Sequence, residues 1–241
     1  MKKIVLATCM LLSAIAGMAQ GNLQLHYDFG RNVYPDEQAE RPKVTGTFEQ
    51  FSADGLGTWF YFIDMDFYND GAAGAYVELS REFNIGKKGF AAHIEYDGGL
   101  CSKKSFSARY QQAALLGAAY NMHSADYKKT LSLQVMYKQF FKGTYNHAFP
   151  SCQFTGVWST TFAHDALTFA GVFDFWRDEQ ANGHGKLVFI SEPQLWFNLN
   201  SIKGLKKCPI SIGTEMEFYS GFYSDNSKMY WNPTIAVKCK L

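Results

Sequence analysis

Bulky apolar residues alternate with polar ones, in stretches of roughly ten residues, through nearly all of the sequence after residue 19. In the first stretch Leu23, Leu25 and Tyr27 alternate with Gln24 and His26. Successive side chains on a strand point to opposite faces, so each stretch predicts a strand with one apolar and one polar face. Strands of this kind in series are typical of an antiparallel β-barrel that crosses an outer membrane, with lipid outside and a polar lumen inside.

The first 19 residues have the features of an export signal. Lys2 and Lys3 give a positive start, residues 4–15 form a short apolar run, and Ala19 ends a stretch of small residues before an expected cut near Gln20. The apolar run is too short to span a bilayer as a helix. We therefore expect a signal peptide at residues 1–19 and an outer-membrane barrel at residues 20–241.

The composition of the chain favours a membrane barrel. Charged residues make up 19% of the sequence and aromatic residues 17%. The charged fraction is below the roughly 25% of ordinary soluble domains, and rings form girdles at both lipid–water interfaces of a barrel. The mean hydropathy is −0.20, which suits a barrel with a polar inner face better than a bundle of apolar helices. The formal net charge of +1 argues against a nucleic-acid partner, because binding phosphate backbones needs concentrated Lys and Arg.

Connections between the expected strands alternate in length. The alternation predicts strands at residues 22–30, 44–52, 58–68, 73–84, 89–97, 106–120, 130–141, 151–162, 166–177, 186–199, 209–219 and 230–241. Long polar or Gly-rich segments, such as residues 31–43 and 142–150, alternate with short ones such as residues 54–57 and 163–165. Outer-membrane barrels have long extracellular loops and short periplasmic turns. We expect one all-β domain, a transmembrane up-and-down antiparallel barrel of about 12 strands in the bacterial outer membrane.

Four cysteines lie in the expected barrel, and an exported protein can oxidise them. Cys208 precedes one expected strand and Cys239 ends the next, while Cys101 and Cys152 fall at the opposite rim. The pairs Cys208–Cys239 and Cys101–Cys152 are therefore candidates, but four cysteines allow three pairings and free thiols fit equally well. Zinc is disfavoured because no Cys-x-x-Cys or Cys/His pair has the ligand spacing, and we expect neither another metal nor a cofactor.

The alternation also assigns the faces of the strands. In residues 59–67 one face carries Asp64 and Asp66, and a carboxylate that faces hydrocarbon is costly, so that face must point into the lumen. The same parity predicts a lumen position for Asp28, Glu78, Glu82, Glu95, Asp97, Asp174, Glu192, Glu215 and Glu217, with His26, His93, Arg109, Lys138, Lys238 and Lys240 as their basic complement. Such charges often only stabilise the wall of a narrow barrel. As a set they indicate a narrow pore or a solute-sized pocket.

Six segments of the expected barrel follow one another at residues 60–64, 76–81, 153–158, 169–175, 191–196 and 212–217. Together they resemble, in order, elements of the Tsx-like nucleoside-specific channel-forming porins of bacterial outer membranes. The most specific piece is the strand with Glu192, Pro193 and Gln194, because proline is otherwise unwelcome inside a strand. The resemblance implies a monomeric barrel of twelve strands with a narrow, aromatic-lined and ionisable channel through which nucleosides diffuse passively.

The residues supply parts for binding such a solute. Bases can stack on lumen rings, while carboxylates and amides can hydrogen-bond to ribose hydroxyls and base edges. The predicted substrate-binding residues are Phe60, Phe62, Asp64, Asp66, Glu78, Glu95, Arg109, Asp174, Trp176, Glu192, Gln194, Trp196, Glu215 and Glu217. The expected partners are a nucleoside-like small molecule and outer-membrane lipid.

Three other classes of protein remain open. An outer-membrane enzyme that acts on lipid would need a nucleophile with a base within hydrogen-bond reach, and no recognisable motif joins Ser80, Ser132 or Ser159 to a histidine. A structural or adhesive surface barrel, or a soluble exported sandwich, would also show alternating strands. We expect no catalysis. The residues leave open the identity of the solute, the pore radius, plugging by loops and the oligomeric state.

Overall fold

The computed structural model describes residues 20–68, 71–103, 106–143, 146–179, 184–223 and 226–241. The expected signal peptide at residues 1–19 lies outside the described residues. The strands are β1 (Gln20–Asp28), β2 (Val44–Ala53), β3 (Gly57–Tyr68), β4 (Gly71–Ile85), β5 (Phe90–Lys103), β6 (Phe106–Arg109), β7 (Ala113–His123), β8 (Lys129–Phe140), β9 (Phe149–Phe162), β10 (Leu167–Glu179), β11 (Gly185–Ser191), β12 (Gln194–Asn198), β13 (Ile210–Ser220) and β14 (Tyr230–Lys240).

Two short helical segments accompany the strands. They are α2 (Gly30–Val33), directly after β1, and the 3-10 helix η1 (Leu199–Ser201), directly after β12. In the part of the chain that the structure describes, no helix has the length and apolar character needed to cross a membrane.

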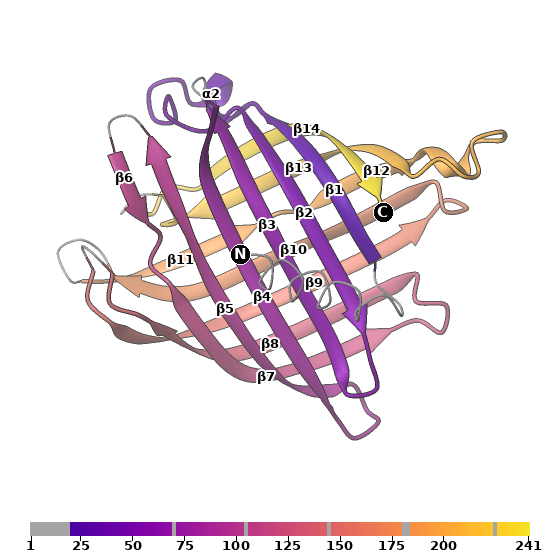
Figure 1. Cartoon of the computed structure of the whole chain (residues 1–241), viewed down its shortest axis with the longest axis horizontal. Helices are drawn as coiled ribbons and strands as arrows, with labels where there is room; N and C mark the ends of the chain where they lie inside the picture. The colour runs from indigo at the N-terminus through magenta and orange to yellow at the C-terminus, as the bar shows by residue number, and fades with distance from the viewer. Residues whose placement is uncertain (1–19, 69–70, 104–105, 144–145, 180–183, 224–225) are drawn as a thin grey trace, which may run out of the picture.

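The strands close into an antiparallel barrel (Figure 1). Consecutive strands pair with each other, and β14 pairs with β1, where Leu25 lies opposite Val237. β11 and β12 together occupy one position between β10 and β13, and β6 only extends the ladder of β5 at its end. The barrel therefore has 12 strands, as predicted from the alternation.

The break between β11 and β12 falls at Glu192 and Pro193, because proline has no N–H to donate to a ladder. The backbone N–H of Glu192 still donates to the carbonyl of Val172 (2.9 Å), and the carbonyl of Pro193 accepts from the N–H of Met216 (2.9 Å). The pairing register with β10 is the same on both sides of the break. The alternation of faces therefore continues through the proline, and Glu192 and Gln194 share the inner face.

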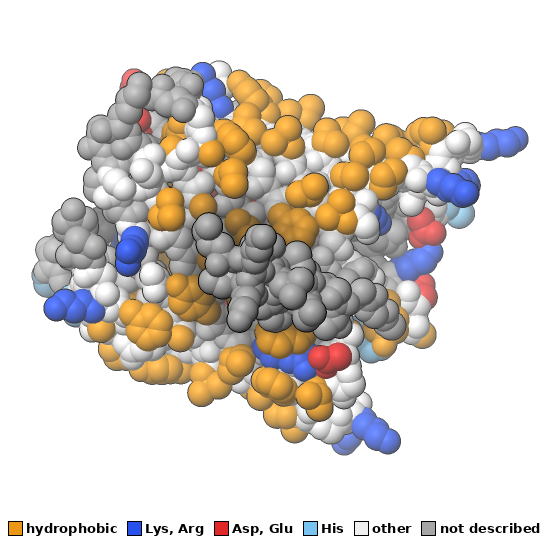
Figure 2. Space-filling view, in the orientation of Figure 1, with side chains coloured by type: hydrophobic (Ala, Val, Ile, Leu, Met, Phe, Trp, Pro, Cys, Tyr) orange, Lys and Arg blue, Asp and Glu red, His pale blue; other side chains and the backbone are white. Residues whose placement is uncertain are grey.

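The outward faces of the strands form an apolar belt. Central outward residues such as Leu25, Leu116 and Val135 are 56%, 61% and 64% exposed. Hydrophobic side chains cover much of the outer face in Figure 2, and most charged side chains lie at the two ends of the molecule. A closed antiparallel barrel with an apolar outer belt is the architecture of bacterial outer-membrane proteins, and the chain is one of them.

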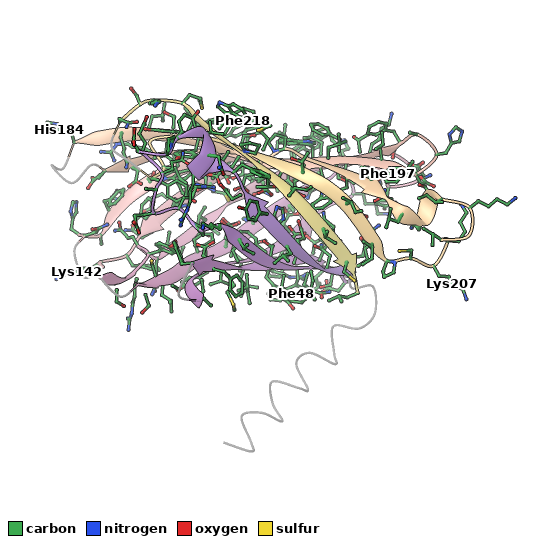
Figure 3. All side chains as sticks on the ribbon, turned by 90° about the horizontal axis from the view of Figure 1, so that it is seen from above. Phe48, Lys142, His184, Phe197, Lys207 and Phe218 are labelled. Carbon is green, nitrogen blue, oxygen red and sulfur yellow. The ribbon has the colours of Figure 1, made fainter. Side chains whose placement is uncertain are left out.

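Most of the long connections lie at one end of the barrel and most of the short turns at the other, although residues 199–209, between β12 and β13, form a long connection at the short-turn end. Lys142 and His184, in two long connections, lie at one end in Figure 3, and Lys207 lies at the other. The strand ends β1 and β14 meet at the short-turn end, where the Leu241 N–H donates to the Gly21 carbonyl (2.9 Å). The end with the long loops is therefore the extracellular end, and the short turns are periplasmic.

The cysteines are free in the described chain. Cys101 is buried on the inner face of β5, whereas Cys152 is exposed on the outer face of β9, so the wall of the barrel separates them. The candidate pair Cys101–Cys152 is therefore wrong. Cys208 and Cys239 are half-buried at the periplasmic end and are also unpaired.

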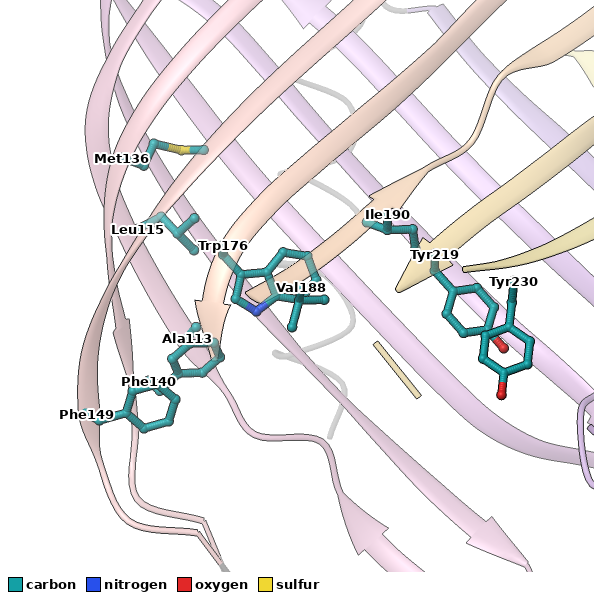
Figure 4. Packing of buried hydrophobic residues seen from close by; sticks show 10 residues of the cluster. All are labelled: Ala113, Leu115, Met136, Phe140, Phe149, Trp176, Val188, Ile190, Tyr219 and Tyr230. Carbon is teal, nitrogen blue, oxygen red and sulfur yellow. The ribbon is translucent and has the colours of Figure 1, made fainter. Parts of the chain in front are cut away.

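The apolar core lies inside the barrel, toward its extracellular end (Figure 4). It consists of Ala113, Leu115, Met136, Phe140, Phe149, Trp176, Val188, Ile190, Tyr219 and Tyr230. Each fully buried large side chain contributes about 1.5–3 kcal/mol to folding. Because these residues point inward, they fill part of the lumen, and the pore is narrower than the strand number alone requires.

Candidate functional site in the barrel lumen

Carboxylates dominate the part of the lumen wall that water can reach. Apart from Asp178 at the extracellular end of β10, eight inward-facing carboxylates of the described strands and of the break before β12 are half-exposed, and we call them the acidic belt: Glu49, Asp64, Asp66, Glu78, Glu95, Asp174, Glu192 and Glu215. They come from β2, β3, β4, β5, β10, the break before β12, and β13. Their common orientation follows from the alternation of side chains along each strand. The belt therefore lies on two separate arcs of the wall, β2–β5 and β10–β13, and not on one side only.

Neighbouring strands hold the carboxylates of β3. The hydroxyl of Thr47, directly across from Asp64 on β2, donates to Asp64 Oδ1 (2.5 Å). The hydroxyl of Thr45 donates in the same way to Asp66 Oδ1 (2.9 Å). These cross-strand pairs fix the two carboxylates on the inner face of the wall.

The opposite wall presents its carboxylates differently. The amide of Gln194 donates to Glu215 Oε2 (2.7 Å), and the amide of Gln153 donates to Asp174 Oδ1 (3.1 Å). The side chain of Glu192 makes no hydrogen bond within the described part of the chain, and it interacts electrostatically with Glu215. A carboxyl group that makes no hydrogen bond to the wall is available to hydrogen-bond a solute.

Two basic side chains of the lumen, Lys138 and His93, are buried in contacts with the wall. Lys138 is 6% exposed and donates to Asp97 Oδ2 (2.9 Å) and Gln153 Oε1 (2.7 Å). His93 is 2% exposed and lies between the carboxylates of Glu82 (3.3 Å) and Glu95 (3.0 Å). Since these two cations are turned into the wall, half-exposed carboxyl groups outnumber half-exposed basic groups on the inner face, where Lys186 and Lys238 remain half-exposed.

Aromatic rings form a second feature of the lumen, beside the carboxylates of β3 and β4. The ring centroids of Phe60 and Phe62 are 6.1 Å apart, those of Phe62 and Tyr76 are 6.0 Å apart, and those of Tyr76 and Tyr110 are 6.2 Å apart. We call this row of four rings the ring ladder. The hydroxyl of Tyr76 donates to Glu78 Oε1 (2.9 Å), which joins the ladder to the acidic belt.

The first extracellular loop, residues 29–43, folds against the mouth of the lumen (Figure 1). Its Arg41 donates from Nε to Asp28 Oδ2 (2.9 Å) and from Nη2 to Glu217. The side chains of Arg41, Asp28 and Glu217 are 11%, 8% and 7% exposed. A buried charge requires this kind of pairing, so Arg41 holds the loop to the inner wall.

Other residues extend this attachment. The amide of Gln38 donates to the hydroxyl of Tyr219 (2.8 Å). Asn232 is fully buried and, in the amide orientation that satisfies its neighbours, donates to Gln38 Oε1 (2.8 Å) and accepts from Arg41 Nη1 (3.1 Å). Lys228 Nζ donates to Glu37 Oε1 (2.6 Å) across the mouth. The loop is therefore fixed to the wall at the extracellular mouth.

The structure brings most of the predicted substrate-binding residues to the lumen face, and their role stays a prediction. On that face lie Phe60, Phe62, Asp64, Asp66, Glu78, Glu95, Asp174, Trp176, Glu192, Gln194, Trp196, Glu215 and Glu217. Two of them are enclosed by the wall. Trp196 is 1% exposed, with Lys238 Nζ 4.1 Å from the centroid of its ring, and Trp176 is 8% exposed within the apolar core. These two rings have no free face for a solute.

The predicted lumen position of Arg109 is wrong. Arg109 lies opposite Leu100, which is 51% exposed on the outer face of β5. Further along β5, Asp97 lies opposite Ala113. The register shifts by one residue in the irregular segment between β6 and β7, and a shift of one residue moves side chains to the other face. Arg109 therefore lies at the extracellular rim, beside Tyr110.

The sequence pattern did not point to four residues of the site: Glu49, Tyr76, Tyr110 and Arg41. Tyr76 could have been found, because the parity that predicts an inward Glu78 also predicts an inward Tyr76. Arg41 could not, because it lies in a loop without alternation, and its partner Glu217 is 176 residues away in sequence. The closed barrel determines which residues a loop residue contacts, and no local sequence pattern predicts these contacts.

Within the described residues, one group could hold a metal ion. Single oxygens of Glu78, Glu95 and Asp97 lie within 4.8 Å of one another. Oxygen ligands of this kind suit hard cations such as Ca²⁺ or Mg²⁺. Asp97 and Glu95 already have Lys138 and His93 as partners, so the group is also satisfied as part of the lumen wall.

The serines considered for catalysis lack a base. The hydroxyl of Ser80 donates to the carbonyl of Phe60 (3.3 Å), and that of Ser132 accepts from the amide of Gln134 (3.3 Å). In the part of the chain that the structure describes, none of Ser80, Ser132 and Ser159 hydrogen-bonds to a histidine. A serine nucleophile needs such a contact, so the arrangement does not support hydrolysis at these residues.

Residues 19–241 match the family described as domain of unknown function DUF5020. The chain belongs to this family. No curated protein matches the sequence. The match covers the whole barrel as one unit, in agreement with the closed fold. The resemblance of the sequence to the Tsx-like channels stays a prediction.

Solved barrels with similar folds have very different sequences. The NanC porin has a TM-score of 0.55 at 9% identity, over 92% of this chain and 100% of that one. The KdgM porin has a TM-score of 0.49 at 10% identity, over 93% of this chain and 99% of that one. LpxR from Salmonella typhimurium has a TM-score of 0.45 at 8% identity, over 91% and 99%. The similarity to the NanC porin extends over the whole barrel and concerns its fold.

Proposed function

We propose that the barrel is a passive channel for small solutes in the outer membrane, with nucleoside-like molecules as the favoured solutes. The acidic belt beside the ring ladder is the observation that carries this proposal. Half-exposed carboxylates and rings on the inner face can contact a molecule inside the barrel. They cannot contact a molecule outside it. The similarity in fold to the NanC porin supports a channel. Since β1 and β14 close the barrel within one chain, a monomer suffices.

The chemistry of the site suits a nucleoside. A base can stack on Phe62, which is half-exposed in the ring ladder, and base–aromatic stacking contributes about 1–3 kcal/mol. Ribose hydroxyls and base N–H groups are donors, and the carboxylates of Asp64 and Glu192 are acceptors. The negative lumen also favours cations over anions. The loop at the mouth and the apolar core narrow the path, so we expect a low conductance.

Replacing Phe62 with alanine is expected to weaken block of the channel by adenosine or uridine about tenfold, because it removes the half-exposed ring on which a base would stack. Single-channel recordings in planar bilayers with increasing nucleoside measure the block. Phe169→Ala is the matched control, because its ring lies on the outer face, 41% exposed. Unchanged block in Phe62→Ala, with normal block in the control, would contradict binding at the ring ladder.

Charge removal inside the lumen tests ion preference separately. The double variant Asp64→Asn with Glu192→Gln removes two carboxylates from the acidic belt and should lower the preference for K⁺ over Cl⁻. The zero-current potential under a KCl gradient measures this preference. Asp126→Asn removes a carboxylate from a periplasmic turn, outside the lumen, and should leave the potential unchanged. A wild-type barrel that prefers Cl⁻ would refute the proposed role of the acidic belt.

A further inference from the structure

Arg81 carries a charge on the lipid-facing side of the barrel. Among the strand side chains that the structure describes, the outward faces bear charges at Arg81, Arg109, Lys129, Arg177 and Glu179. All except Arg81 lie within three residues of a strand end. A charged side chain on the lipid face costs up to about 2–4 kcal/mol near the bilayer midplane and little near the interface. Arg81 therefore needs a partner at that face.

Its neighbours enclose the guanidinium in a small site, which we call the Arg81 clamp. Trp59 lies directly across from Arg81 on β3, and the guanidinium carbon is 5.0 Å from its ring centroid. Phe83 lies two residues further on β4, with its ring centroid 4.9 Å away. Nη2 donates to Asp54 Oδ1 (2.9 Å) in the periplasmic turn between β2 and β3. This hydrogen bond holds the pKa of the Asp54 carboxyl below its ordinary value, so the pair is charged at neutral pH.

The clamp leaves one donor group without an acceptor. Arg81 is 4% exposed, and its Nη1 is buried without a hydrogen-bond partner. A buried donor that lacks an acceptor is costly, and the cost is larger for a charged group. Trp59 and Phe83 are 40% and 41% exposed, so the two rings that contact the guanidinium also face the lipid. The missing partner is therefore an acceptor that comes from the lipid.

The position of the clamp indicates the chemical class of that acceptor. Asp54 fixes it to a periplasmic turn, at the level where Trp and Tyr rings of membrane proteins meet lipid headgroups. Phosphate oxygens are the anionic acceptors at that level, and a guanidinium fork matches their geometry. We propose that the Arg81 clamp binds the phosphate group of a phospholipid in the periplasmic leaflet. This site lies outside the lumen and does not depend on the proposed channel.

Native mass spectrometry of the purified barrel, released from micelles that contain dioleoylphosphatidylglycerol, tests the proposal. The wild type should retain one phospholipid, and Arg81→Gln should lower the retained fraction about tenfold, as expected for one charge-assisted hydrogen bond. Lys129→Gln is the matched control, because it removes another outward-facing cation at the start of β8. Equal retention in the wild type and Arg81→Gln, or equal loss in Lys129→Gln, would overturn the site.

Two further measurements distinguish binding of the phospholipid phosphate from binding of the acyl chains and from binding of free phosphate. Dioleoylglycerol has the same chains without phosphate and should not be retained, and retention equal to that of the phospholipid would overturn phosphate recognition. Inorganic phosphate at millimolar concentration should not displace the phospholipid, and displacement would assign the clamp to a free anion. Asp54→Asn covers the case in which Arg81→Gln does not fold. It removes the negative charge beside the guanidinium, while the amide oxygen can still accept the hydrogen bonds of the turn. The uncompensated guanidinium should strengthen retention of the phospholipid, and unchanged or weaker retention contradicts the proposal.

Discussion

Replacing Arg41 with alanine is expected to lower the free energy of unfolding by about 3–5 kcal/mol, because it leaves two buried carboxylates without their cation. Asp28 and Glu217 are 8% and 7% exposed at the side chain, so water cannot take the place of the guanidinium without opening the mouth. The same change detaches the first extracellular loop from the wall and should raise the single-channel conductance. Denaturant unfolding followed by tryptophan fluorescence measures the first effect, and bilayer recording measures the second.

Lys43→Ala is the matched control for this change. Lys43 lies in the same loop and is also basic, but its side chain is exposed. Its substitution should change stability by no more than about 0.5 kcal/mol and leave the conductance unchanged. If Arg41→Ala lowered stability without changing the conductance, the loop would be part of the wall and no constriction of the path. If neither quantity changed, the ion pairs of Arg41 would not hold the loop.

Val135→Arg is expected to destabilise the barrel by about 2–4 kcal/mol, the cost of a cation on the lipid face near the bilayer centre. Val135 lies near the middle of β8 and is 64% exposed on the outward face. Its ladder partners on that face are Ala118 and Phe154, so no carboxylate lies opposite a new charge there. Unfolding by denaturant in lipid vesicles measures the change.

Val157→Arg makes the same chemical change on the other face. Val157 lies on β9, next to β8, and is 40% exposed on the lumen side, where Ser132 lies across from it. An arginine there meets water and the acidic belt, so the cost should stay below about 1 kcal/mol. Losses of equal size for the two variants would be inconsistent with the assignment of faces.

The sequence determined the strands and most of their faces. Side chains on a strand alternate with a period of two, so the carboxylates of Asp64 and Asp66 reveal the inward face of the whole strand without any knowledge of its neighbours. The same logic predicted that Glu192 and Gln194 share a face, and the unbroken register across Pro193 bears this out. It would also have found Arg81, which differs in parity from Glu78 and Glu82.

The alternation of apolar and polar residues does not show where the hydrogen-bonded pairing of two strands is interrupted. It also does not show which distant parts of the chain come into contact. Arg109 changed face because a one-residue shift between β6 and β7 reverses the parity, and only the pairing of β5 with both strands reveals that shift. The enclosure of Trp196 by Lys238 depends on the packing of β12, β13 and β14.

The position of the first extracellular loop also depends on contacts between distant parts of the chain. Arg41 is ordered by Asp28 and by Glu217, which closure of the barrel brings together from β1 and β13. The sequence therefore determined which faces exist, because that depends on local backbone geometry. The tertiary structure alone decided which lumen groups are open to a solute and which are neutralised by the wall, because that depends on neighbours that are distant in sequence.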